Sequence, residues 1–496
     1  MFGGTAQFGS TFQIVVFVAL TALVGGLTWW KVRQSSHHDG SEQDVYLAGK
    51  GLSWFFVAGA ITLTNLSTDQ LVGMNGNQML LLAWWEIAGF AGLMFLAFVF
   101  VPLYYRYNCT TVTELLERRY DGRSIRTLVS ALFLFGNILI YLPAALYSGG
   151  LFLQSLFGSE IPLMAFAVGL AIIGAAYTMF GGLRAVAVMD TYSGIGVLAL
   201  ALLIVFLALS AVDFDIVTNM PAERLTMVGA ADSPIPFHTL FTGMLFIQIF
   251  YWSTNQNITQ RAMAAPTVKE AQKGVFAAAI VRILIVPPIV VIPGVVAFKL
   301  FGDIGDAAYG RLVAEVLPVW LSGAFAAMVA AAVITTFSAV LNSTVALYSV
   351  DFHEQFIGPV PNHWKLGAVM SVVATVIALV MVPIFQNAES IINLLQELNG
   401  LFSMPILSAF IAALLFRNVA AAASIVGVLC GVALYGTFSF VLAPAGLVTL
   451  HYIDFMVVTL VTSVLAALAF NRLVLGRRAV FIGMDIFRSE RIAPDA

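Results

Sequence analysis

Five ionisable side chains stand inside long apolar stretches of this 496-residue chain: Asp69, Glu86, Asp190, Arg282 and Glu397. An ionisable group inside a membrane is costly, and it usually marks a functional site. An arginine at the centre of a bilayer costs roughly 2.5–3.5 kcal/mol on insertion scales. Arg282 therefore needs an acidic partner, and either Glu86 or Glu397 could supply it.

Uncharged amides and an aromatic residue accompany these charges in the apolar stretches. Each hydroxyl of a sugar both donates and accepts hydrogen bonds, so a sugar site needs carboxylates, amides and cations together with an aromatic face. One set of side chains has this composition: Gln70, Glu86, Gln248, Tyr251, Arg282 and Gln396. A structural ion pair surrounded by unrelated amides explains the same residues about equally well.

Two adjacent hydroxyls, Thr335 and Thr336, follow two alanines in another apolar stretch. Sodium, like calcium and magnesium, prefers hard oxygen ligands. Adjacent helix hydroxyls and the carbonyls of a broken helix could therefore form a neutral cage for the ion. The alternative is that each threonine only bonds back to its own helical turn, as threonines in membrane helices usually do.

Two of the apolar stretches are interrupted by polar residues. The first interruption covers 65–70 and continues with small and polar residues to 77, and the second covers 248 and 251–257. Transporters with inverted repeats place broken helices at corresponding positions of their two halves, with the binding site between them. Both interruptions could instead be helix ends at the membrane surface.

The composition is that of a membrane protein. Sixty percent of the residues are hydrophobic, 10% are charged, and the mean hydropathy is +0.95. A soluble domain carries about 25% charged residues. The net charge of −3 and two cysteines indicate neither a nucleic-acid partner nor a disulfide framework. No nucleotide-binding loop or nucleophile triad is visible, so we do not expect an enzyme.

The hydropathy pattern predicts about thirteen transmembrane helices, since each span needs about 20 apolar residues. They lie near 8–30, 53–76, 79–105, 124–157, 161–180, 186–212, 236–256, 272–300, 317–352, 364–385, 391–416, 419–441 and 449–471. We expect three parts: a first helix and cytoplasmic linker (1–52), a transport core (53–416, divided into 53–212 and 236–416), and accessory helices with a cytoplasmic tail (417–496).

The basic residues predict the orientation, because Lys and Arg are enriched in cytoplasmic loops. If the spans alternate from an outside N-terminus, one side collects Arg106, Arg118, Arg119, Arg123, Arg126, Arg184, Arg261, Lys269, Lys273, Arg417, Arg472, Arg477 and Arg478. The opposite side carries Asp213, Asp215, Glu223 and Asp232 in one loop. We expect a multi-pass protein of the plasma membrane, the inner membrane in a Gram-negative cell, with a cytoplasmic C-terminus.

Several short motifs, in consistent order from about 46 to 400, carry a family likeness. They are YLAGK at 46–50, NLSTDQLVGM at 65–74, GGLRAV at 181–186 with Asp190, Tyr251-Trp252, Asn255-Gln256, Gln260-Arg261, EAQKG at 270–274, and LNST at 341–344 with Asp351. The chain resembles the sodium/solute symporter family, and within it the sodium–sugar cotransporters, including the bacterial sodium/galactose type. The resemblance implies an all-α membrane fold with a leucine-transporter-type five-plus-five inverted repeat and two broken helices.

The resemblance also implies roles for individual residues. The solute site of the sugar carriers falls on Gln70, Glu86, Gln248, Tyr251, Arg282 and Gln396, and the gates fall on Tyr251, Trp252 and Met74. Sodium ligands fall on the carbonyls of Leu63, Leu66 and Ala332 and on the hydroxyls of Thr335 and Thr336. Asp190 matches an aspartate on the inward path of the ion. Gln248 and Arg282 replace an asparagine and a lysine of the sugar carriers.

The expected function is therefore the sodium-coupled import of a small polar solute, a sugar in the first instance, by alternating access. The partners are sodium, the solute and the lipid bilayer. Because arginine presents a planar fork that can hold a carboxylate, the departure at Arg282 leaves a non-sugar or acidic solute open as the alternative: a polyol, sialic acid, an amino acid or another carboxylate.

Overall fold

The computed structural model describes residues 11–34, 42–120, 122–157, 161–386 and 390–483. The start of the first predicted span, part of the 1–52 linker and the end of the predicted tail lie outside the described residues. In the first half of the chain the helices are α1 (Thr11–Gln34), α2 (Glu42–Leu47), η1 (Ala48–Lys50), α3 (Trp54–Asn65), α4 (Thr68–Gly76), η2 (Leu80–Ala83), α5 (Trp84–Phe95), η3 (Leu96–Phe100), α6 (Val101–Arg106), α7 (Val112–Tyr120), α8 (Arg123–Gly136), η4 (Asn137–Tyr141), α9 (Leu142–Phe157), α10 (Leu163–Ala211) and α11 (Ala222–Leu225).

The second half of the chain is also helical. Its elements are η5 (Phe237–Phe241), α12 (Gly243–Ile249), η6 (Phe250–Thr254), α13 (Gln256–Met263), α14 (Val268–Leu284), α15 (Val286–Phe301), η7 (Gly305–Ala307), α16 (Ala308–Val316), α17 (Val319–Tyr348), η8 (Ser349–Ile357), α18 (His363–Phe385), α19 (Ile391–Leu415), α20 (Ala421–Thr437), η9 (Phe438–Leu442) and α21 (Tyr452–Leu473). Two short strands, β1 (Phe416–Arg417) and β2 (Val480–Phe481), pair antiparallel.

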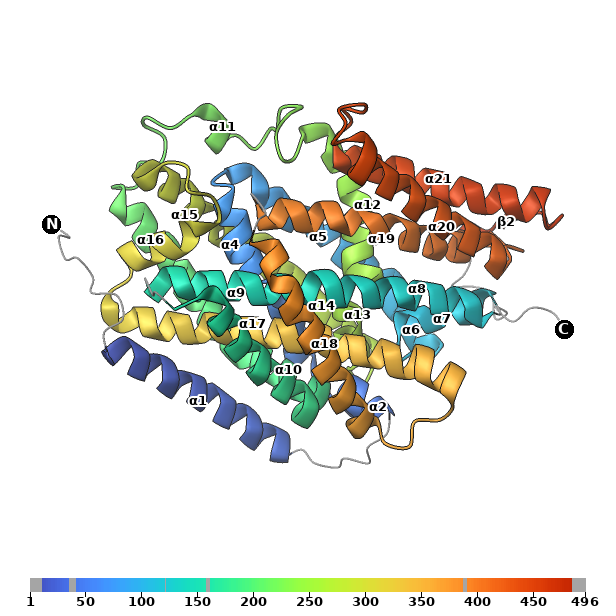
Figure 1. Cartoon of the computed structure of the whole chain (residues 1–496), viewed down its shortest axis with the longest axis horizontal. Helices are drawn as coiled ribbons and strands as arrows, with labels where there is room; N and C mark the ends of the chain where they lie inside the picture. The colour runs from blue at the N-terminus through green and yellow to red at the C-terminus, as the bar shows by residue number, and fades with distance from the viewer. Residues whose placement is uncertain (1–10, 35–41, 121, 158–160, 387–389, 484–496) are drawn as a thin grey trace.

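Within the described residues, nine helical stretches are long and apolar enough to cross a membrane. The other predicted spans correspond to α1, to the first half of α10, and to the two interrupted stretches α3–α4 and α12–α13. The all-α membrane fold is therefore confirmed, with nine of the predicted spans found as helices long enough to cross a membrane among the described residues. Figure 1 shows α8, α9 and α17 running along the long axis of the molecule, with α18 crossing them obliquely.

The long helix α10 is two spans joined by a sharp bend. Gly182 has φ 54° and ψ −157°, a conformation that favours glycine. A side chain here would also collide with the chain, because a Cβ atom would lie 2.9 Å from the carbonyl oxygen of Val45. This glycine separates the predicted spans 161–180 and 186–212.

Both interruptions predicted from the sequence are real breaks of the helical backbone. The first helix stops at Asn65, and the backbone is non-helical at Leu66 and Ser67 before α4 begins. The second stops at Thr254, and Asn255 is extended, with its side chain accepting from the backbone N–H of Asn257. Asn, Ser and Thr side chains compete for backbone hydrogen bonds and so favour such breaks over continuous helix.

Small residues let the helices around these breaks approach closely, as is usual in membrane bundles. At Gly92 in α5, an added Cβ atom would lie 2.2 Å from the backbone carbonyl oxygen of Gln248 in α12. This contact presses α5 directly against the second broken helix. An almost entirely buried helix, α17, packs against α10, α1, α9 and α3.

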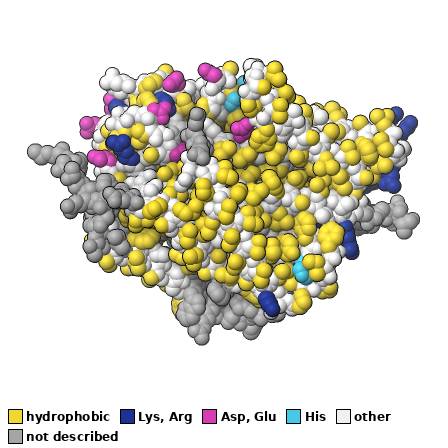
Figure 2. Space-filling model, viewed as in Figure 1, with side chains coloured by type: hydrophobic (Ala, Val, Ile, Leu, Met, Phe, Trp, Pro, Cys, Tyr) yellow, Lys and Arg dark blue, Asp and Glu magenta, His cyan; other side chains and the backbone are white. Residues whose placement is uncertain are grey.

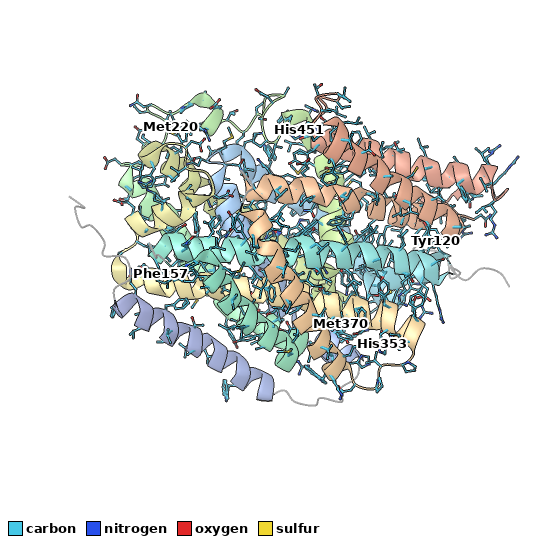
Figure 3. The ribbon with its side chains drawn as sticks, in the orientation of Figure 1. Tyr120, Phe157, Met220, His353, Met370 and His451 are labelled. Atoms are coloured by element: carbon cyan, nitrogen blue, oxygen red, sulfur yellow. The ribbon has the colours of Figure 1, made fainter. Side chains whose placement is uncertain are left out.

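The two ends of the molecule differ in charge. On the face shown in Figure 2, Asp and Glu side chains lie at its left and top, mixed at the left with a few Lys and Arg side chains, whereas its right end shows Lys and Arg side chains without Asp or Glu. Figure 3 labels Met220 and Phe157 toward the first end and Tyr120 and His353 toward the other. Apolar side chains cover the region between, as a surface in contact with lipid requires.

Candidate functional site

A partly enclosed cavity lies between the two broken helices. Its walls come from α3, α4, α5, η4, α9, α12, η6, α13, α17 and α19. The lining residues are Thr64, Asn65, Ser67, Asp69, Gln70, Trp85, Tyr141, Ala144, Ala145, Ile247, Gln248, Tyr251, Trp252, Asn257, Thr336, Val340, Ile392, Leu395, Gln396 and Asn399. Hydroxyls and amides predominate among the polar groups, and four aromatic rings face them, a composition suited to a small polar solute.

Four of the six predicted solute residues line this cavity: Gln70, Gln248, Tyr251 and Gln396. The side-chain amide of Gln248 is held at both ends, since its Nε2 donates to the Trp85 carbonyl at 2.8 Å and its Oε1 accepts from Trp252 Nε1 at 2.9 Å. Gln396 Oε1 accepts from Asn399 Nδ2 at 3.2 Å. Gln248 therefore orients an aromatic ring as well as lining the cavity.

The other two predicted solute residues, Glu86 and Arg282, are not among the lining residues. They form an ion pair in which each residue is only 1% exposed. Arg282 also donates to Gln70 Oε1 at 3.3 Å and to the Thr62 carbonyl at 3.3 Å. Its guanidinium carbon lies 4.7 Å from the ring centroid of Trp252. Arg282 thus contacts two residues that line the cavity, Gln70 by a hydrogen bond and Trp252 by a cation–π contact, without lining the cavity itself.

The predicted gate residues differ in their placement. Tyr251 accepts a hydrogen bond from Asn65 Nδ2 at 3.1 Å, which joins the two breaks across the cavity. Its ring meets that of Trp252 edge to face, with centroids 5.4 Å apart. Met74 is fully buried within α4 and is not among the lining residues. Tyr251 and Trp252 therefore form an edge-to-face aromatic pair in the wall of the cavity.

Several lining residues were not in the predicted site. Asp69, Tyr141, Asn257 and Asn399 all contribute polar atoms to the cavity. The hydroxyl of Tyr141 donates to Asn399 Oδ1, which joins η4 to α19. The signal for these residues was present, since each is a polar side chain within a predominantly apolar segment, but the sequence alone does not show which segments face one another.

The predicted sodium ligands gather around the first break. The backbone N–H of Ser67 donates to the Asn65 carbonyl, so it does not bond to the Leu63 carbonyl as a continuous helix would require. The adjacent Leu66 is non-helical, with φ −78° and ψ 68°. Across from this break, Thr336 of α17 lines the cavity, and its buried hydroxyl has no hydrogen-bond partner among the described residues.

The neighbouring Thr335 and Asp190 continue this polar group into the protein. The Thr335 hydroxyl donates to the Ala332 carbonyl at 3.0 Å, which places these two predicted ligands on one helical turn. Asp190 of α10 is fully buried and accepts from Thr64 at 3.4 Å, and it also interacts with Thr335. Oxygen atoms of the three elements α3, α17 and α10 thus meet beside the cavity, and such atoms suit a sodium ion.

The match to known families agrees with this geometry. The model of the sodium:solute symporter family matches residues 45–431, so the chain belongs to that family. It is a multi-pass membrane protein that couples the movement of a solute to sodium. The matched residues include both broken helices, the cavity lining and the oxygen cluster around Thr336.

Two bacterial relatives cover most of the chain. The chain is 34% identical to the uncharacterized symporter YidK of Escherichia coli over 87% of this chain and 79% of the relative. It is 29% identical to the sodium/glucose cotransporter of Vibrio parahaemolyticus over 85% and 84%. A third relative, the sodium/myo-inositol cotransporter 2 of mouse, is 25% identical over 85% and 68%.

Solved structures show the same fold. A sodium-coupled sialic acid symporter in a substrate-bound, outward-open state superposes with a TM-score of 0.79, at 17% identity, over 94% of this chain and 98% of that one. The nucleobase-cation-symport transporter Mhp1 in a closed conformation gives 0.55, at 16% identity, over 87% and 94%. These comparisons confirm the predicted leucine-transporter-type architecture.

Proposed function

We propose that this protein imports a sugar or a related polyol together with sodium. The observation that carries the proposal is the cavity between the broken helices, where amides, hydroxyls and a carboxylate surround a space bounded by Trp85, Tyr141, Tyr251 and Trp252. Sugar hydroxyls need both donors and acceptors, and the apolar face of a sugar ring packs on aromatic rings. The names of the sodium/glucose and sodium/myo-inositol relatives support the same solute class.

Sodium and solute are coupled through the first broken helix. The ion binds to the carbonyls of Leu63 and Leu66, the Ala332 carbonyl and the hydroxyls of Thr335 and Thr336. Binding orders the backbone at the break, and Gln70 follows it by one turn in α4. An ion that holds the break therefore also holds a solute-binding side chain.

Release requires the aromatic pair to open. The hydrogen bond between Asn65 and Tyr251 joins the two broken helices at the cavity. When the two repeats rock against each other, this bond parts, Tyr251 and Trp252 move off the solute, and the ion leaves past Asp190. Each sodium ion crossing 100 mV contributes roughly 2.3 kcal/mol, and a tenfold ion gradient adds about 1.4 kcal/mol. One ion can then support solute accumulation of roughly two to three powers of ten.

Uptake into proteoliposomes tests this function. An inward sodium gradient should drive accumulation of at least one labelled sugar or polyol, and an equal potassium gradient should not. Accumulation driven by a proton gradient without sodium would contradict the ion assignment. If no neutral sugar or polyol accumulates under a sodium gradient, the solute class is wrong.

An acidic solute is the second candidate, and one observation favours it. The guanidinium of Arg282 packs against the ring of Trp252, which lines the cavity. A rotation of that ring would therefore expose the guanidinium to the solute. The structural similarity to a sialic acid symporter fits this alternative. Arg282 would first have to leave Glu86. Uptake of labelled sialic acid, proline and pantothenate beside neutral sugars separates the two candidates.

We also propose that the protein lies in the plasma membrane with its N-terminus outside and its C-terminus in the cytoplasm. The asymmetry of charge between the two ends of the molecule supports this orientation. Fusions at the C-terminus test it, since a fluorescent protein there should fold and glow, whereas alkaline phosphatase there should stay inactive. The reverse result would invert the topology.

A further inference from the structure

One carboxylate faces the cavity directly. Asp69 lies in the first turn of α4, two residues beyond the first break, and it is among the lining residues. The hydroxyl of Ser67, at the break itself, donates to Asp69 Oδ1. The positive end of the α4 dipole favours a negative charge at this position. The broken helix therefore positions an anionic acceptor in the wall of the solute site.

Asp69 is the only charged side chain among the described residues that line the cavity. The buried cation that contacts Gln70 and Trp252, Arg282, is engaged by Glu86, Gln70 and the Thr62 carbonyl. The ring of Trp252 covers that cation, and Trp252 is itself held by Gln248. Among the described residues that line the cavity, a solute thus meets one carboxylic acid side chain and no Lys or Arg side chain.

The other polar residues that line the cavity around Asp69 are uncharged. The tyrosines Tyr141 and Tyr251 line the same cavity as Asp69. Their hydroxyls are bonded to Asn399 and Asn65 respectively. Hydroxyl groups of a solute are donors that a carboxylate accepts strongly. A carboxylate on a solute would meet a like charge with no compensating cation, which penalises it.

We propose that Asp69 is the specificity-determining residue of the solute site: it accepts hydrogen bonds from the hydroxyls of an uncharged sugar or polyol and excludes solutes that carry a carboxylate. This inference rests on the proposed function and narrows its solute class. In this proposal Arg282 does not bind the solute. Arg282 instead positions Gln70 and Trp252.

The test uses matched pairs of solutes that differ only in charge. Full-length protein in proteoliposomes is offered a labelled neutral sugar under a sodium gradient, with glucose and glucuronate, or galactose and galacturonate, as competitors. The neutral member of a pair should compete at least about 100-fold better than the uronate, since like-charge contact costs several kcal/mol. Equal competition by the two members would overturn the proposal.

The variant Asp69→Asn keeps the shape of the side chain and removes its charge. The KM for the neutral sugar should rise about tenfold, the loss typical of one hydrogen bond to a charged group. The preference over the uronate should fall by about tenfold or more. If the KM for sodium changes and the preference does not, Asp69 serves the ion and the proposal fails.

Two controls protect the interpretation. Asp69→Glu retains the charge, so it should still exclude the uronate even if its transport rate falls. Asp213→Asn removes a charge from an exposed loop residue with φ 52°, a conformation that asparagine tolerates, and it should leave both quantities unchanged. If the wild type accumulates no sugar, the proposed function fails and this inference with it. If it accumulates sugar and Asp69→Asn keeps the preference, only this inference fails.

Discussion

Arg282 and Glu86 form a buried ion pair behind the solute cavity, and the arginine reaches across the first broken helix to both of its halves. It donates to the Thr62 carbonyl in α3 and to Gln70 in α4. The break at Leu66 and Ser67 lies between these two contacts. One side chain thus holds the geometry of the break on which both the ion site and the solute site depend.

Breaking this pair should destabilise the protein strongly. Glu86→Gln leaves the Arg282 charge buried without its carboxylate, which costs about 3–5 kcal/mol in comparable buried pairs. The melting temperature of the purified protein in detergent should fall accordingly. The double variant Glu86→Gln with Arg282→Met should recover part of the loss, because no uncompensated charge remains. Lys273→Gln, which breaks an exposed pair with Glu270, should change the melting temperature little. If Lys273→Gln lowered the melting temperature as much as Glu86→Gln does, burial of the Glu86–Arg282 pair would not account for the loss of stability.

Removing the hydroxyl of Thr336 should weaken sodium binding selectively. Its buried oxygen has no partner among the described residues and lies at the cavity beside the first break. Thr336→Ala should raise the sodium concentration for half-maximal uptake about tenfold, as expected for one lost ligand interaction of about 1.4 kcal/mol. Thr336→Ser should stay near wild type. Thr344→Ala in the same helix removes a hydroxyl that only bonds back to Val340 and serves as the matched control. Unchanged sodium dependence would remove Thr336 from the cage.

Asp306 should make stability depend on pH. It lies outside the membrane spans in η7, and burial raises the pKa of its carboxyl to about 6, although the Ile391 N–H that it accepts at 3.0 Å opposes the rise. Since the unfolded pKa is lower, the folded state loses stability as pH rises from about 4 to about 6, by at most about 3 kcal/mol.

The variant Asp306→Asn keeps an acceptor for Ile391 and cannot ionise. It should therefore melt at a higher temperature than the wild type at pH 7, and the difference should shrink as the pH falls and vanish only below the unfolded pKa, at about pH 3. Melting curves of both proteins at several pH values measure this difference. A constant offset across that range would show that Asp306 does not titrate in it.

The polar cluster around Asp351 should stabilise the end of the molecule that carries α7. The carboxylate of Asp351 is fully buried; it accepts from Arg126 Nε at 2.7 Å and from Thr111 at 3.1 Å, and Ser130 also donates to it. Asp351→Asn leaves Arg126 with fewer acceptors and should cost about 3 kcal/mol. Faster hydrogen exchange in α7 should accompany the lower melting temperature. Glu315→Gln, at an exposed position, should alter neither, and if α7 exchanges at the wild-type rate in Asp351→Asn, the cluster does not hold that helix.

The sequence alone was sufficient for the class of protein and for the breaks. A chain with long apolar segments and few charged residues must be surrounded by lipid. The polar residues at 65–70 and 251–257 favour non-helical backbone regardless of how the helices pack. Those are local properties of the chain. The partner of Arg282 was left open between two carboxylates, and the structure selects Glu86, while Glu397 lines a separate cavity with Asp303 and Asp306.

What the sequence determined by itself is that this chain is a sodium-coupled membrane transporter with two broken helices and polar groups paired within its spans. Only the tertiary structure decided which of those groups face the solute. In the sequence, Glu86 and Arg282 are charged residues within apolar segments, just as Asp69 is. In the structure, Glu86 and Arg282 form an ion pair beside Trp252 and do not line the cavity, whereas Asp69 does. The reason is that facing depends on how α4, α5, α12 and α14 pack around the first break, and close contacts such as Gly92 with Gln248 set that packing over long separations in the chain.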